Sequence, residues 1–155
     1  KDNGPVSSVI KVDQFDTHAG QGSEEYSNFG TQLAIVDDII AGYKEGLGDA
    51  WDRSIILTLT EFGRTVAVNG SLGTEHGYGS VGLLAGGSIA KSRVLTKWPG
   101  LAINEQFEGR DLMATLDYRS VCAACIEKAL GLDHDLIASE VFFTPKLPRI
   151  HDYIF

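Results

Sequence analysis

The feature that most constrains the fold is the stretch from Ser54 to Thr60, in which nearly every side chain is apolar or β-branched. Such a run is typical of a β-strand that is covered on both faces, because a half-exposed strand would alternate apolar and polar residues. It leads directly into Glu61, a glycine and Arg64. A buried strand that ends in a carboxylate and a guanidinium indicates a polar site at its carboxyl end.

A second strand and a helix are expected before this run. Residues 6–15 are rich in β-branched side chains and predict a strand. Apolar residues then recur at helical spacing from about Asn28 to Leu47, with Asp37 and Asp38 toward water. Strand, helix and strand make a βαβ unit, whose two strands we expect to be parallel neighbours. The expected fold class is therefore α/β, with a mostly parallel sheet and flanking helices.

Fewer regular elements are expected in the second half of the chain. Residues 81–87 predict a short third strand, and a final helix should run from about Asp117 to Leu130 and end at Gly131. The helix face expected to point inward carries Val121, Cys122, Cys125 and Leu130. Residues 144–155 contain two prolines and are expected to form a surface tail.

These elements do not complete a sheet that is covered on both faces. Two or three strands with two helices would leave one face open. The sequence also starts at Lys1, without an initiator methionine. We therefore expect residues 1–155 to be a single α/β domain that forms the C-terminal part of a larger one. Its expected partner is the N-terminal part of the same protein.

The acidic composition restricts other partners. The formal net charge of −8 argues against non-specific nucleic-acid binding, which needs basic residues to neutralise phosphates. It argues equally against docking on an anionic membrane surface. No apolar run approaches the roughly 20 residues of a membrane-spanning helix. An anionic small-molecule substrate is still compatible with this charge, because local cations decide its binding.

Asp16 and His18 are candidate metal ligands. They follow the first expected strand, and their spacing places both side chains on one side of an extended chain. A carboxylate oxygen and an imidazole nitrogen suit Zn²⁺ or Mn²⁺. The alternative is an Asx-type turn, in which Asp16 accepts hydrogen bonds from backbone N–H groups and His18 is merely exposed.

Three more side chains are candidates for a site. Glu61 is a ligand or base, or it forms an ion pair with Arg64. Arg64 in turn could hold a phosphate or sulfate group. His76 lies in a glycine-rich loop, where glycine allows the backbone to approach a ligand closely. His134 and His151 are expected to be solvated or capping residues.

An ordered set of motifs extends across most of the chain. It comprises Phe15-Asp16-Thr17-His18 with Gln21, residues 60–65, Asn69, residues 73–79 and Asp117-Tyr118-Arg119. From about residue 9 to residue 132, these motifs resemble the C-terminal part of a bacterial family catalogued as domain of unknown function 1501. Members of that family often carry twin-arginine export signals, so the resemblance implies a periplasmic or otherwise exported protein.

That family in turn resembles the alkaline phosphatase superfamily, which includes sulfatases. By this resemblance Asp16, Glu61 and His76 match metal ligands, and His18 stands in for a further histidine. Arg64 would steady the anion. Phe62 stands where the superfamily has a histidine ligand, and phenylalanine cannot bind a metal. The nucleophile and another metal-binding aspartate would come from outside this chain.

The resemblance implies a metal-dependent hydrolase of phosphate or sulfate esters. One or two divalent ions (Zn, Mn or Ca) would polarise a phosphoryl or sulfuryl oxygen. The chain by itself would be inactive without the nucleophile. The alternative is a non-catalytic relative with the same fold, which binds a ligand or another exported protein, and Phe62 favours this alternative.

Overall fold

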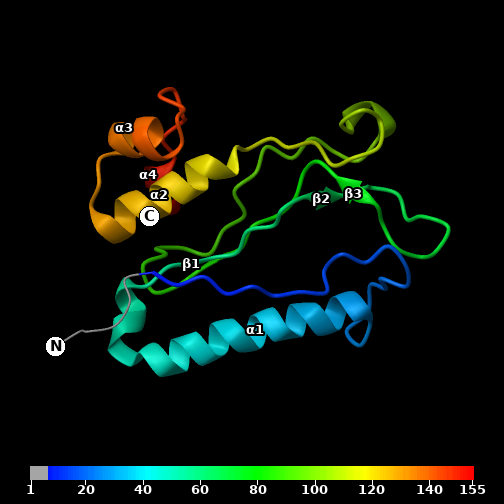
Figure 1. Ribbon diagram of the computed structural model, residues 1–155, viewed down its shortest axis with the longest axis horizontal. Helices are drawn as coiled ribbons and strands as arrows, with labels where there is room; N and C mark the ends of the chain where they lie inside the picture. The colour runs from blue at the N-terminus through cyan, green and yellow to red at the C-terminus, as the bar shows by residue number, and fades with distance from the viewer. Residues whose placement is uncertain (1–6) are drawn as a thin grey trace.

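A computed structural model describes residues 7–155 (Figure 1). The helices are α1 (Asn28–Leu47), α2 (Tyr118–Leu130), α3 (His134–Leu136) and α4 (His151–Ile154). Shorter helical segments are η1 (Gly48–Arg53), η2 (Ile103–Glu105) and the π-helical turn η3 (Ile137–Val141). The strands are β1 (Ile56–Leu57), β2 (Gly63–Arg64), β3 (His76–Gly77) and β4 (Leu84–Ala85).

The strands form two small antiparallel pairs instead of one parallel sheet. β1 pairs with β4, and β2 pairs with β3. The predicted α/β fold with a mostly parallel, alkaline-phosphatase-like sheet is therefore wrong. Residues 7–15 belong to no strand, and residue 6 lies outside the described part of the chain. The apolar run at 54–60 does supply β1, but its ladder partner is the next apolar run along the chain.

Helix α1 begins and ends as the sequence predicts. The Ser27 hydroxyl accepts a hydrogen bond from the Gly30 N–H, which caps the first turn. Gly48 follows the last turn with a φ of 50°. Asp37 and Asp38 are exposed as expected, and the opposite face is half-buried. No residue of α1 is fully buried, so the helix covers the structure from one side only.

The core lies at the opposite end of the molecule from β2 and β3, where α2, α3 and α4 gather (Figure 1). Asp117 caps α2 by accepting a hydrogen bond from the Arg119 N–H, and Gly131 ends the helix with a φ of 66°. The buried apolar side chains are Ala123, Ala124, Ile137, Ala138, Leu147, Ile150 and Ile154. Alanine on α2 allows the following segments to pack close to its backbone.

Three expectations about this region differ from the structure. Leu130 is 50% exposed, whereas Val121 of the same predicted face does pack against the buried cluster of Ala124, Ile150 and Ile154. Residues 144–155 contribute Leu147 and two other buried side chains, so this segment is part of the core. His134 is buried, with Nε2 2.9 Å from the Leu147 carbonyl oxygen.

The molecule exposes more surface than a compact monomer of its mass. Its accessible surface is 10921 Å² for 16.7 kDa, whereas a folded monomer of that mass exposes about 7,600 Å². Large apolar side chains such as Val9 and Leu72 are exposed at 96% and 72%. Within residues 7–155, no helix combines the length and hydropathy that crossing a membrane requires.

Candidate metal centre

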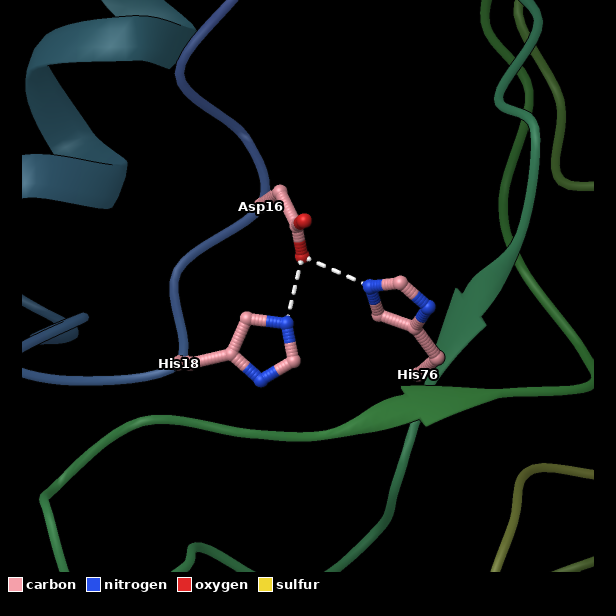
Figure 2. Close-up of side chains that lie close together, drawn as sticks. All are labelled: Asp16, His18 and His76. Atoms are coloured by element: carbon pink, nitrogen blue, oxygen red, sulfur yellow. Dashed lines mark hydrogen bonds and ion pairs between the residues drawn. The ribbon is translucent and has the colours of Figure 1, made fainter.

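Three side chains from two separate segments converge beside β3 (Figure 2). Asp16 and His18 lie in the loop that leads to α1, and His76 is the first residue of β3. Asp16 Oδ1 is 3.0 Å from Nε2 of His18 and 3.0 Å from Nε2 of His76. The structure thus brings together three of the four ligands predicted from the sequence, with their ligand atoms within 4.8 Å of one another.

Backbone contacts hold the two segments in this position. The Thr74 N–H donates to the Thr17 carbonyl over 3.2 Å, and the Gly20 N–H donates to the Ser71 carbonyl over 2.9 Å. Gly73 lies so close to His18 that any Cβ at position 73 would collide with the His18 backbone. Glycine is therefore required here for the two loops to approach each other.

His18 is oriented by a carboxylate on its other ring nitrogen. Nδ1 lies 2.6 Å from Oε2 of Glu75, and Oε1 of Glu75 accepts a hydrogen bond from Asn69 Nδ2 over 2.5 Å. The amide of Asn69 and then the His18 ring lower the pKa of Glu75 below its usual value. An ionised Glu75 accepts a hydrogen bond from Nδ1–H, which leaves the Nε2 lone pair directed at Asp16.

His76 is held by an aromatic contact instead. The ring of Phe62 stacks on the His76 ring with centroids 3.8 Å apart and an angle of 18° between the planes. Phe62 supplies no ligand atom, but its ring restricts the orientation of the imidazole. Neither Glu75 nor Phe62 was predicted to support the site, and only their adjacency to His76 and Glu61 in the sequence could have suggested it.

Arg64 contacts the same carboxylate as the two histidines. Its Nη1 is 2.5 Å from Asp16 Oδ1, and its Nε donates to the Thr74 hydroxyl over 3.0 Å. Hydrogen bonding by Arg64, and then by His76, lowers the pKa of Asp16 below its usual value. Arg64 therefore pairs with Asp16 and not with Glu61, which was the alternative expected from the sequence. Glu61 is exposed and lies outside the group of ligand atoms.

A hydrogen-bonded ring of side chains fixes Arg64. Oε1 of Gln21 accepts from the Thr74 hydroxyl over 2.7 Å and from the Thr17 hydroxyl over 2.9 Å. Thr74 is buried, and it links Gln21 to the guanidinium of Arg64. These hydrogen bonds connect the Asp16 carboxylate, through Arg64, to the side chain of Thr17. The peptide bond between Asp16 and Thr17 closes the ring.

The donor set fits a divalent transition metal. Two imidazoles and one carboxylate are the ligands of catalytic zinc sites and also suit Mn²⁺, whereas Ca²⁺ takes six to eight oxygens. Ligand atoms around a tetrahedral Zn²⁺ with bonds of about 2.0 Å lie about 3.3 Å apart. The separations of 3.0 Å from Asp16 Oδ1 to each Nε2 atom are close to this value. Three protein ligands would leave a fourth position open.

Comparison with known proteins identifies the family. Residues 6–135 match the family model described as protein of unknown function (DUF1501). The search of curated proteins and the search of solved structures gave no match. The matched range contains the whole candidate metal centre and most of the chain, and the chain therefore belongs to the DUF1501 family.

Proposed function

We propose that this chain binds one divalent cation, Zn²⁺ or Mn²⁺, through Asp16, His18 and His76. One observation carries the proposal: both Nε2 atoms face Asp16 Oδ1 at 3.0 Å, while Glu75 holds the other nitrogen of His18. A metal-bound histidine almost always donates its second N–H to a carboxylate, carbonyl or water. The same geometry is therefore what a site prepared for a cation would have.

The reaction class that this site supports is hydrolysis of phosphate or sulfate esters. A divalent cation would polarise a phosphoryl or sulfuryl oxygen. Arg64, 2.5 Å from Asp16, would add a fixed positive charge beside the ester anion. The ring of hydrogen bonds through Thr74 and Gln21 would keep that charge in place.

The nucleophile is proposed to come from outside this chain. The two hydroxyls next to the site, on Thr17 and Thr74, both donate to Gln21 and are not directed at a base. The surface of 10921 Å², against about 7,600 Å² for a compact monomer, supports a further polypeptide that covers it. We propose that this is another part of the same protein, exported as family members with twin-arginine signals are.

A second candidate function is a non-catalytic binding module. It is favoured by the contact of Arg64 with Asp16 Oδ1, because that oxygen already has two hydrogen-bonding partners, Arg64 and His76, without any cation. In this case the cluster would join the loops through hydrogen bonds alone. Metal binding distinguishes the two functions.

The test is a titration of chelator-treated protein with Zn²⁺ by isothermal calorimetry. One ion per chain is expected, with a loss of about 100-fold or more in affinity in His76→Ala. His151→Ala is the matched control, since His151 pairs with Asp152 near the C-terminus and should leave Zn²⁺ binding unchanged. No stoichiometric binding by the wild-type chain, or equal binding by His76→Ala, would sink the metal proposal and favour the binding module.

A further inference from the structure

A polar pocket adjoins the metal centre at the first turns of α1. Its volume is about 340 Å³, and it shares Asp16 and His18 with the group of candidate ligands. The other side chains that matter here are Gln14, Thr17, Asn28 and Gln32. A molecule in this pocket would therefore lie directly beside a cation at the metal centre.

Carboxamides dominate the chemistry of the pocket. Asn28 and Gln32 lie one helical turn apart on α1 and so share a face. Asn28 Nδ2 donates to the Gly20 carbonyl over 2.9 Å. Among residues 7–155, the carboxamides of Gln14 and Gln32 have no hydrogen-bonding partner, and each offers a donor and an acceptor. No lysine or arginine lines the pocket.

Gln14 has an uncommon backbone conformation for this place. Its φ is 76°, in the left-handed region that non-glycine residues rarely occupy. Such conformations cost free energy and are concentrated at ligand-binding sites. The uncommon backbone conformation is thus found at a residue that lines the pocket.

We infer that this pocket binds the uncharged, polyhydroxylated part of an ester substrate, such as a sugar or another polyol. Vicinal hydroxyls match carboxamides, since both groups donate and accept hydrogen bonds. A second phosphate would need cationic side chains, and an alkyl or aryl group would need an apolar wall; this lining has neither. The assignment of the charged end to the metal and Arg64 rests on the proposed function.

Two ligands that differ only in their hydroxyl groups test the inference. The Zn²⁺-loaded chain is titrated with glucose 6-phosphate and with hexyl phosphate. We expect tighter binding of the sugar phosphate. In Gln32→Leu, its affinity should fall by about two- to tenfold for the lost hydrogen bonds. Hexyl phosphate and Zn²⁺ should bind this variant as they bind the wild type.

A matched control and a metal-free arm separate this inference from the proposed function. Asn104→Leu changes an exposed amide that lies in η2, outside the pocket, and should alter no affinity. If the chain binds no Zn²⁺, the proposed function fails. The pocket is then tested by whether glucose, but not cyclohexanol, shifts the Gln14 and Gln32 side-chain amide resonances. Equal affinity for the two phosphates, or no shift with glucose, overturns the inference.

Discussion

Replacing Glu75 by glutamine should weaken Zn²⁺ binding by about 10- to 100-fold. In the native site, Glu75 accepts hydrogen bonds on both oxygens, from Asn69 Nδ2 at 2.5 Å and from His18 Nδ1 at 2.6 Å. Glutamine has one oxygen and one NH₂ group, so it cannot accept from both partners. If its oxygen serves Asn69, its NH₂ group faces His18 Nδ1, and the ring proton moves to Nε2, where the metal would bind.

The opposite orientation of the introduced glutamine amide also loses one of the two hydrogen bonds. Its oxygen would accept from His18 Nδ1, but its NH₂ group would then face the NH₂ group of Asn69. Calorimetric titration with Zn²⁺ near neutral pH measures the loss, and Glu140→Gln, an exposed glutamate in η3, is the matched control. If Glu75→Gln binds Zn²⁺ within about twofold of the wild type, the orientation of His18 by a carboxylate is not what prepares the site.

Three further predictions concern the loops and the helices. Gly73→Ala should force the loop away from His18 and lower both Zn²⁺ affinity and the melting temperature, measured by calorimetry and circular dichroism. Asp117→Ala should lower the free energy of unfolding by about 1 kcal/mol through loss of the α2 cap, measured by urea denaturation; Asp117→Asn, which can still cap, should lose less. Because Arg119 lowers the pKa of Asp117, this contribution is present at neutral pH and lost as the pH falls through the lowered pKa, so Asp117→Asn should show a weaker acid dependence of stability. Ala123→Leu should overpack the core and cost about 1–3 kcal/mol in the same denaturation assay.

The two long helices, α1 and α2, could be predicted because their signals are local. Ser27 and Asp117 stand directly before α1 and α2, and their side chains cap those helices within a few residues. The sheet could not be predicted in this way. The apolar run at 54–60 indicates a strand but does not identify its partner, and its antiparallel pairing with β4 replaced the parallel neighbour expected at residues 6–15.

The difference between local signals and contacts distant in sequence also applies to the metal centre. Asp16, His18 and His76 could be proposed from their residue types and from their positions in glycine-rich loops. Glu61 was proposed on the assumption that both strand ends meet at one edge of a parallel sheet. The two antiparallel pairs form no such edge. Glu75 was missed because its role depends on a contact with His18, which lies 57 positions away in the sequence.

The ligand atoms of the centre belong to residues as far as 60 positions apart, as Asp16 and His76 are. A cation bound there would act as a removable crosslink between the segment before α1 and β3. It would bind the folded chain only, so its effect on stability would grow with the logarithm of its free concentration. A chelator would release this crosslink without touching the core around α2, which lies at the other end of the molecule (Figure 1). Loss of the metal would thus loosen residues 7–27 first and leave the C-terminal helices folded.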